Sequence, residues 1–388
     1  MKQNRIVFAV LWILSLVGIS FYGGPVSYGF FALTTLIPIV SFAYLLAVML
    51  FFRIYQELDS KNLVADHVVP FYFNLMNEFF FGFASIRVRF YSSFSSIGGL
   101  DDGTEYELLP GTGIQKQTSL VCRYRGEYEV GIKRVEMQDY FRLLRLSYHN
   151  REALRVVVKP NLVQLEELRG VDFPDVPARD SMFHRTEPDV LVRRYEQGDD
   201  LRRIHWKASA RSGELLSRGY VGEERDGVGL LMGTWRCSEE PKQYLPIENK
   251  MLEVTLALAL FFAKKKISLR TLHLSGELTE RSIFGMEQFE GYYAALSGAE
   301  FREEYREEAF LEAAVARQEL FALRTVFLVL QDWTDAAEGM VRLLSENHVY
   351  TVVYLVHDGE LRKNTGWSIP RAKLFQIRTD ADLREVMG

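Results

Sequence analysis

The sequence predicts a multidomain protein with three folded parts: a two-helix transmembrane hairpin, a β-sandwich-like segment and a three-layer α/β domain. Three observations lead to this prediction. Near its start the chain has a long apolar stretch without charges. Short runs in which apolar and polar residues alternate come next, and the last part contains apolar runs separated by helical stretches. We place the hairpin at residues 1–60, the sandwich at 61–150, a linker with a dense motif at 151–226 and the α/β domain at 227–388.

The composition is that of an ordinary globular protein rather than of a disordered chain or a low-complexity fibre. The 388 residues carry 46 Lys and Arg against 51 Asp and Glu, so no basic excess exists to neutralise the phosphates of a nucleic acid. The two cysteines, Cys122 and Cys237, are too few for a disulfide scaffold or a multi-cysteine metal site. We expect both to be reduced core residues, and we expect no cofactor.

The first 53 residues contain the material for two membrane spans. Between Arg5 and Arg53 there is no Asp, Glu, Lys, Arg or His, and Gly-Gly-Pro at residues 23–25 divides this stretch into apolar runs at 6–22 and 28–52. Both runs are long enough, because a helix needs about 17–25 apolar residues to cross a membrane. A cleaved signal peptide is the alternative, but a second apolar run does not normally follow one. We therefore predict a protein integral to the bilayer of the cell membrane.

The basic residues predict the orientation of the two spans. Lys2 and Arg5 precede the first span, Arg53 and Lys61 follow the second, and the connecting loop carries no charge. Cytoplasmic flanks of membrane spans carry the excess of Lys and Arg. The N-terminus and the C-terminus are therefore both predicted to be cytoplasmic.

Short alternating runs follow the hairpin. Residues 85–90, 119–124 and 127–135 alternate apolar and polar side chains, and turn sequences such as Gly98-Gly99 separate them. Short strands at regular spacing without a helical period are typical of an antiparallel sandwich. No catalytic constellation is visible in this segment.

Strands and helices alternate from residue 227 onward. Runs that are apolar on both alternations predict strands covered on both faces, and the intervening helices predict a parallel, doubly wound sheet. The expected strands are 228–232, 267–274, 325–330, 350–356 and 374–377, and the expected helices are 247–265, 300–323 and 335–347.

A Glu-rich stretch at residues 300–319 belongs to the second of these helices. We interpret it as a solvated helix face stabilised by ion pairs three to four residues apart, with an acidic docking surface for a partner as the alternative. Its charged residues include Arg302, Glu303, Glu304, Arg306, Glu307, Glu308 and Arg317.

The densest motif lies at residues 193–224. Asp199 or Asp200 can cap a helix that starts near Leu201, and Gly213 can end it. Cations at helical spacing could clamp carboxylates or phosphates, or could pair with acidic residues inside the protein. These cations are Arg202, Arg203, Lys207 and Arg211. The residues by themselves favour a structural joint, with a binding surface and a catalytic site as alternatives.

The motif contains Arg194, Tyr195, Gly198, Asp199, Arg202, Ile204, Trp206, Ser209, Ala210, Arg211, Gly213 and Leu215. In this order and spacing they closely resemble the signature of domain of unknown function family 58, and we call them the signature residues. The segment Arg125-Gly126-x-Tyr128-x-Val130-Gly131 also resembles the Arg-Gly-x-Tyr segment of that family's β-rich region. The resemblance extends to the organisation of nearly the whole chain.

The resemblance implies a von Willebrand factor A-like domain at the C-terminus. Members of the family commonly occur beside MoxR-type AAA+ ATPases and membrane proteins with transglutaminase-like domains. The implied role is that of an adaptor or co-chaperone for a MoxR-type AAA+ ATPase, with no established catalytic reaction. Other membrane proteins are further candidate partners.

Von Willebrand A-type domains often hold Mg²⁺ through Asp-x-Ser-x-Ser at the end of the first strand. Mg²⁺ prefers hard oxygen ligands. Here the corresponding run, residues 233–237, has no Asp and carries Arg236, which would repel a cation. Thr234 and Asp332 are the weak candidate ligands that remain, and we expect no Mg²⁺ binding by this route.

Three hypotheses for the function remain. The first is a membrane-anchored, non-catalytic interaction protein, the second an enzyme that uses Asp199, Asp200 and His205 as acid–base groups, and the third a metal-dependent ligand-binding domain. The sequence has no Gly-x-x-x-x-Gly-Lys phosphate loop, no Gly-x-Ser-x-Gly elbow and no His-Glu-x-x-His zinc pair. We therefore expect the first.

The predicted orientation can be measured with a topology reporter. A reporter that is active only outside the membrane, fused after Lys61, should be inactive, because Lys61 follows the second span on the cytoplasmic side. A reporter that is active only in the cytoplasm should be active at the same position. The opposite pair of results would overturn the predicted orientation.

Overall fold

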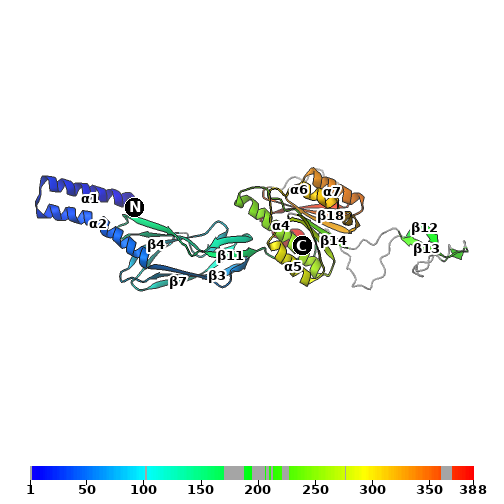
Figure 1. Ribbon diagram of the computed structural model, residues 1–388, viewed down its shortest axis with the longest axis horizontal. Helices are drawn as coiled ribbons and strands as arrows, with labels where there is room; N and C mark the ends of the chain where they lie inside the picture. Colours follow the sequence, from blue (N-terminus) through cyan, green and yellow to red (C-terminus); the bar gives the residue numbers. More distant parts are fainter. Residues whose placement is uncertain are drawn as a thin grey trace. The chain divides into compact units, whose positions relative to one another are not determined.

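The chain divides into two units, residues 1–161 and residues 162–388, in its computed structural model. Figure 1 traces the helices and strands of both units in chain order. The structure describes residues 2–100, 103–169, 188–194, 206, 209–210, 213–220, 227–275, 277–359 and 369–388.

Two apolar helices open the first unit. Helix α1 spans Lys2–Phe21 and helix α2 spans Gly24–Phe51. Their mean hydropathies are 1.9 and 2.2, and both are long and apolar enough to cross a membrane, as predicted. The hydroxyl groups of Ser15 and Thr34 share a hydrogen bond of 3.1 Å that joins the two helices.

Helix α2 continues directly into the β-strands. It ends at Phe51, and strand β1 begins at Phe52 without a linker. Leu45 and Val48, in the last two turns of α2, are buried in the same core as the strands. The end of α2 is therefore part of the β-structure rather than a free membrane helix.

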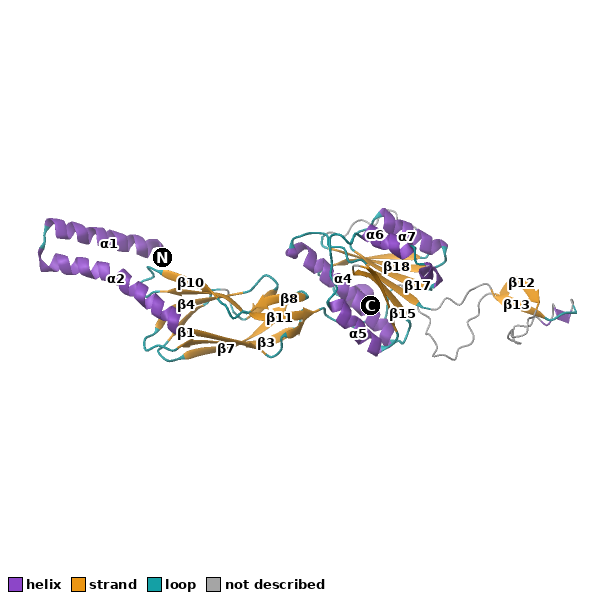
Figure 2. Ribbon diagram, in the orientation of Figure 1, coloured by secondary structure: helices purple, strands orange, loops and turns teal. Residues whose placement is uncertain are grey.

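Two antiparallel four-stranded sheets share this core (Figure 2). Their orders are β1-β3-β7-β5 and β10-β9-β4-β6. Phe71 and Phe73 from the first sheet and Ile86 and Val88 from the second are buried together, so the sheets pack face to face as a sandwich. The strands are Phe52–Leu58 (β1), Val68–Asn77 (β3), Phe83–Phe90 (β4), Ser95–Gly98 (β5), Glu105–Leu108 (β6), Gly113–Cys122 (β7), Ile132–Gln138 (β9) and Arg145–His149 (β10).

A three-stranded sheet completes the first unit. It consists of β2 (Asn62–Val64), β11 (Leu154–Lys159) and β8 (Gly126–Val130), in that order. Strand β11 lies within the range predicted as a linker, yet its pairing with β2 and β8 makes residues 154–159 part of the sandwich.

Two glycines of the segment 125–131 flank strand β8. Gly126 and Gly131 have φ values of +129° and +86°, which side-chain-bearing residues rarely adopt. A Cβ atom at position 131 would also lie 2.6 Å from Gln56 Oε1 and 3.3 Å from Phe71 Cζ. Gly131 is therefore required both by its backbone conformation and by close packing.

A six-stranded sheet forms the centre of the second unit, in the order β16-β15-β14-β17-β18-β19. Five strands run parallel, and β16 pairs antiparallel with β15. All five predicted strands are confirmed. The six strands are Val228–Met232 (β14), Leu269–Ser275 (β15), Glu277–Ile283 (β16), Thr325–Leu330 (β17), Tyr350–His357 (β18) and Ala372–Arg378 (β19).

Helices cover both faces of this sheet, as Figure 2 shows. Leu230 and Phe327 pack in one core with α4 and α5, whereas Leu231 and Leu328 pack in the other with α6 and α7. Successive strand residues alternate between the two cores, which is why the strands are apolar throughout. The helices are Pro241–Lys264 (α4), Met286–Ser297 (α5), Glu307–Val315 (α6), Asp335–Glu346 (α7) and Leu383–Met387 (α8), and a 3₁₀ turn spans Gln318–Ala322.

Three expectations about local structure are corrected. The predicted helix 300–323 is shorter, because Arg302 forms a β-bridge with Trp235 and α6 begins only at Glu307. The hairpin strand β16 and helix α5 were not predicted. Both cysteines are free, as expected, but only Cys122 is buried, whereas Cys237 is exposed.

The double requirement for glycine at position 131 predicts a large effect of Gly131→Ala. It should lower the free energy of unfolding by about 2–6 kcal/mol, since a strained φ and crowding each cost about 1–3 kcal/mol. The matched control is Gly99→Ala, where φ is +71° but no atom lies within 4 Å of the added Cβ, so only the strain is expected. Thermal melting of the detergent-solubilised chain measures the loss of stability in both variants. Equal losses at the two positions would show that the contacts with Gln56 and Phe71 cost nothing.

Candidate functional site

The carboxyl end of strand β14 is the candidate site in the second unit. Strand β14 lies at the centre of the sheet, and the chain leaves it toward β15 on one side and returns to β17 on the other. Ligands of open α/β sheets bind at the carboxyl ends of the strands where the order reverses in this way. We call this edge, formed by the residues after β14 and β17 and the start of α6, the switch-point edge.

The structure brings both weak metal candidates to the switch-point edge. Thr234 follows β14 by two residues, and Asp332 follows the neighbouring parallel strand β17 by two residues. Thr234 is 1% exposed and donates its hydroxyl to the carbonyl of Leu274 at 2.7 Å. Asp332 Oδ1 accepts a hydrogen bond of 2.9 Å from the amide of Trp333.

A second acidic side chain, Glu307, also occupies the switch-point edge. Its Oε1 accepts a hydrogen bond of 2.6 Å from the amide of Gln331, and its Oε2 accepts one of 3.2 Å from the amide of Asp332. A Cβ atom at Gly233 would lie 3.1 Å from Glu307 Oε1. The Glu307 carboxyl therefore fills the space between the ends of β14 and β17.

The interpretation of the Glu-rich stretch as a solvated helix face is wrong for Glu307, which is 3% exposed. The buried residues of α6 are Glu307, Phe310, Leu311 and Ala314. These positions have the i, i+3, i+4, i+7 spacing of one helix face. The apolar period of this helix was therefore the signal that could have identified Glu307 as a buried carboxyl.

Burial changes the titration of Glu307. The pKa of its carboxyl is raised to about 7, chiefly because burial disfavours the charged form. The two amide hydrogen bonds lower the pKa, and the nearby carboxylates of Asp332 and Glu308 raise it. The charge of the switch-point edge therefore changes close to neutral pH.

Arg236 lies on the same edge but is neutralised within the protein. Its guanidinium forms hydrogen bonds of 2.7 and 3.3 Å with the two carboxylate oxygens of Glu248, which is 2% exposed. The same guanidinium lies over the ring of Tyr244 at 4.0 Å. Gln331, which is 8% exposed, donates its side-chain amide to the carbonyl of Trp235 and so joins the residues after β14 to those after β17.

The side-chain oxygens at the switch-point edge do not fit a Mg²⁺ site. In the part of the chain that the structure describes, no group of three or more His, Cys, Asp or Glu could hold a metal ion. The Thr234 hydroxyl donates to a carbonyl, and both Glu307 oxygens already accept main-chain amides. The arrangement can take up and release a proton, and it connects α6 to two strands.

The signature residues are described only in part. Arg194 ends strand β12 (Pro188–Arg194) and pairs with Leu216, the first residue of β13 (Leu216–Tyr220). The hydroxyl of Ser209 accepts a hydrogen bond of 2.8 Å from the amide of Leu216. The signature residues outside the described part are Tyr195, Gly198, Asp199, Arg202, Ile204 and Arg211. The acid–base candidates Asp200 and His205 and the clamp candidates Arg203 and Lys207 also lie outside it.

The described signature residues agree with a helix that ends at Gly213. Trp206, Ser209 and Ala210 are helical, and the amide of Gly213 donates to the carbonyl of Ser209 at 3.0 Å. Gly213 has a φ of +71°, as expected for the residue after a helix. Ser209 is 8% exposed, whereas Trp206 is 67% exposed and Leu215 is 48% exposed. The signature therefore has a buried polar contact and an apolar exposed surface.

One family model matches the chain. Residues 191–278 match the family described as "Protein of unknown function DUF58". The matched range includes the end of β12, the signature, strands β13 to β15 and the first two residues of β16. This finding supports the resemblance that the sequence motif indicated. No curated protein matches the chain.

Solved structures match only loosely. A CARDB domain from Pyrococcus furiosus, in complex with di-metal ions, is 14% identical, with a TM-score of 0.20, over 28% of this chain and 91% of that chain. Native alpha-2-macroglobulin from Escherichia coli is 12% identical, with a TM-score of 0.23, over 32% of this chain and 20% of that chain. The cupredoxin domain of amoB from Nitrosocaldus yellowstonii is 9% identical, with a TM-score of 0.21, over 32% of this chain and 95% of that chain. These similarities support no conclusion about function.

The raised pKa of Glu307 predicts a pH-dependent stability. Its folded pKa of about 7 exceeds the ordinary value of 4.5, so its stabilising contribution is complete below about pH 4.5 and is lost as the pH rises to about 7. The loss amounts to about 3 kcal/mol. Glu307→Gln keeps an uncharged group of the same size, and its melting temperature should therefore fall less than that of the wild type over this range.

The matched control is Glu312→Gln, because Glu312 is an exposed glutamate of the same helix. It should retain the pH dependence of the wild type. Parallel melting profiles for the wild type and Glu307→Gln would contradict the assignment of this titration to Glu307.

Proposed function

We propose that the chain is a membrane-anchored, non-catalytic member of the DUF58 family that acts as an adaptor or co-chaperone for a MoxR-type AAA+ ATPase. In this proposal α1 and α2 anchor the protein in the cell membrane with both termini in the cytoplasm. The second unit acts as a von Willebrand factor A-like domain, and the signature contributes to the surface that binds the ATPase.

The observation that carries the proposal is the exposed apolar surface of the signature. Trp206 is 67% exposed and Leu215 is 48% exposed, within the range that matches the family model. Tryptophan is enriched among the residues that dominate binding energy in protein interfaces. Ser209, three residues after Trp206, is buried and accepts a hydrogen bond of 2.8 Å from the amide of Leu216, which ties this part of the signature to strand β13.

The surface of the hairpin supports the anchoring. Leu14 of α1 and Leu33 and Ile39 of α2 are 55–60% exposed, in helices without charges between Arg5 and Arg53. Soluble proteins rarely expose apolar patches of this extent. Lipid hydrocarbon would cover these side chains along the length of both helices.

The architecture of the second unit supports the von Willebrand A-like assignment. Its mainly parallel sheet lies between two helical layers, and Thr234 and Asp332 follow neighbouring strands, where the resemblance implies the ligand-binding edge of such a domain. Glu307 occupies that edge in this chain. We propose that the edge serves here as a structural element and that partner binding falls to the signature.

Copurification from solubilised membranes tests the proposed partner. The tagged full chain, with a slowly hydrolysed ATP analogue present, should recover an AAA+ ATPase identifiable by mass spectrometry. Trp206→Ala should lower the recovery about tenfold or more, because removing an interface Trp costs about 2 kcal/mol or more. Phe284→Ala is the matched control, since Phe284 is an exposed aromatic residue of the second unit outside the matched range.

Retained recovery with Phe284→Ala and lost recovery with Trp206→Ala would support the proposal. Equal recovery with both variants would exclude Trp206 from the binding surface. Failure of the wild-type chain to recover any AAA+ ATPase would contradict the adaptor role itself.

A further inference from the structure

Three loops of the sandwich meet at the end where α2 enters it. They are residues 78–82 between β3 and β4, residues 109–112 between β6 and β7, and residues 139–144 between β9 and β10. Main-chain and side-chain hydrogen bonds join them to α2 and to one another. These bonds run from the Glu78 amide to the Phe51 carbonyl (3.2 Å), from the Gly111 amide to the Phe79 carbonyl (3.2 Å) and from the Tyr140 hydroxyl to the Gly82 carbonyl (2.8 Å).

Large apolar side chains project from these loops into the surroundings. Phe80 is 80% exposed, Leu109 is 70% exposed, Tyr140 is 61% exposed and Phe141 is 55% exposed. We call these four residues the apolar collar. Exposure of this many large apolar groups at one end of a domain marks a contact with another surface.

A buried asparagine holds two of the loops in place. Asn77 is 1% exposed, and its side-chain amide donates to the carbonyls of Phe81 (2.9 Å) and Leu109 (3.1 Å). Its Oδ1 accepts a hydrogen bond of 2.9 Å from the amide of Phe79. One polar side chain thus organises both the loop that carries Phe80 and the loop that carries Leu109.

A buried aspartate does the same for the third loop. Asp139 is 1% exposed, and its carboxylate oxygens accept hydrogen bonds from the amides of Phe141 (3.2 Å) and Leu144 (2.7 Å). The carbonyl of Asp139 also accepts a hydrogen bond of 3.0 Å from the amide of Arg142. Tyr140 and Phe141 are therefore presented by an ordered turn.

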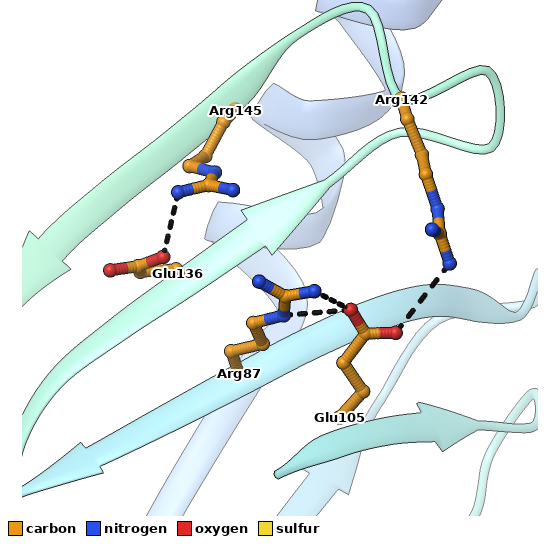
Figure 3. Close-up of polar contacts among 5 residues, drawn as sticks. All are labelled: Arg87, Glu105, Glu136, Arg142 and Arg145. Atoms are coloured by element: carbon orange, nitrogen blue, oxygen red, sulfur yellow. Dashed lines mark hydrogen bonds and ion pairs between the residues drawn. The ribbon is translucent and has the colours of Figure 1, made fainter. Parts of the chain in front are cut away.

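Ion pairs tie the same turn to the sheet beside it. Figure 3 shows Glu105 of β6 between Arg87 of β4 and Arg142 of the turn. Arg87 Nε lies 2.7 Å from Glu105 Oε1, and Arg142 lies 3.6 Å from Glu105 Oε2. At the base of the turn Arg145 binds Glu136, which is 5% exposed, at 3.1 Å. Ion pairs thus connect the turn that carries Tyr140 and Phe141 to strands β4, β6 and β9.

The collar is continuous with the apolar helices. The rings of Tyr140 and Tyr44, on α2, have their centroids 5.1 Å apart. Asn4 donates its side-chain amide to the carbonyl of Phe141 at 3.0 Å, and Arg5 donates to the carbonyl of Leu143 at 2.7 Å. The loop 139–144 therefore lies beside the first helical turn of α1, which contains Arg5, the last charged residue before the apolar run. Figure 2 shows the start of α1 beside this end of the sandwich.

We infer that the sandwich makes its own contact with the bilayer, through the insertion of the apolar collar into the lipid interface around the anchor. The inference rests on the proposed anchoring by α1 and α2. In an anchored chain the boundary between water and hydrocarbon lies where charged residues give way to apolar ones, here next to Arg5. Phe141 and Tyr140 lie at this level, and aromatic side chains are enriched at such interfaces.

Lipid fits the collar better than a protein partner does, because Tyr140 and Phe141 lie next to helices that lipid must already cover. A partner protein would have to displace the lipid beside α1 and α2 in order to reach Tyr140. The bilayer reaches the same side chains without any such displacement. Insertion of the collar would fix the tilt of the sandwich at the membrane surface.

Spin labels on single cysteines test the inference in liposomes that contain the full chain. Cys237→Ser leaves only Cys122, which is 1% exposed and shielded from the label. Phe141→Cys and Leu109→Cys report on the collar, and Leu14→Cys reports on the anchor. Val68→Cys is the matched control, since Val68 is 69% exposed at the other end of β3, roughly 30 Å from Asn77.

The measured quantity is the ratio of collisions with oxygen, which concentrates in lipid, to collisions with a water-soluble nickel complex. Labels at positions 141 and 109 should give a ratio several-fold above that at position 68 and below that at position 14. If the labels at positions 141 and 109 gave the same ratio as position 68 while position 14 gave a lipid-like ratio, the insertion of the collar would be contradicted and the anchoring would stand. Protection from both reagents would show a protein on the collar and would also overturn it. A water-like ratio at position 14 would overturn the anchoring and the collar together.

Discussion

The direct passage of α2 into the β-sandwich is the constraint on which the first unit depends. Leu45 and Val48 occupy the core of the sandwich, although they belong to a helix of lipid-spanning length. Rotation or sliding of α2 would expose these side chains to water and cost several kcal/mol. The position of the loops along the axis of α2 is therefore fixed. As a result, Tyr140 and Phe141 lie beside the first turn of α1.

Burial of a titratable group has a comparable role in the second unit. The edge where an α/β sheet commonly receives a ligand contains the carboxyl of Glu307, whose oxygens accept the amides that follow β17. The same side chain begins α6 and lies against Gly233 after β14, so it connects one helix to two strands. Because burial raises its pKa to about 7, the folded state loses stability relative to the unfolded state as the proton is lost near neutral pH.

Much of the fold could be predicted, because burial on both faces leaves a strong pattern. The strands 228–232 and 325–330 were predicted with the bounds that the structure gives them. Strand β16, Glu277–Ile283, was missed because it is an antiparallel edge strand with mostly polar residues rather than a continuous apolar run. Thr234 and Asp332 were candidates because of the resemblance to von Willebrand A-type domains, and the parallel pairing of β14 with β17 places them on neighbouring strand ends. The burial of Glu307 was not predicted, because the Glu-rich composition of its segment suggested a solvated helix face.

The local order of side chains specifies which segments are apolar enough to enter lipid, which runs form strands and where the signature lies. Which polar groups are buried and which apolar groups are exposed depends instead on contacts between distant segments. Asn77 and Asp139 become buried, and Phe80 and Leu109 exposed, because loops distant in sequence meet at one end of the sandwich. Such meetings depend on strand pairing and helix entry, and these contacts between distant residues leave no periodic pattern in the chain.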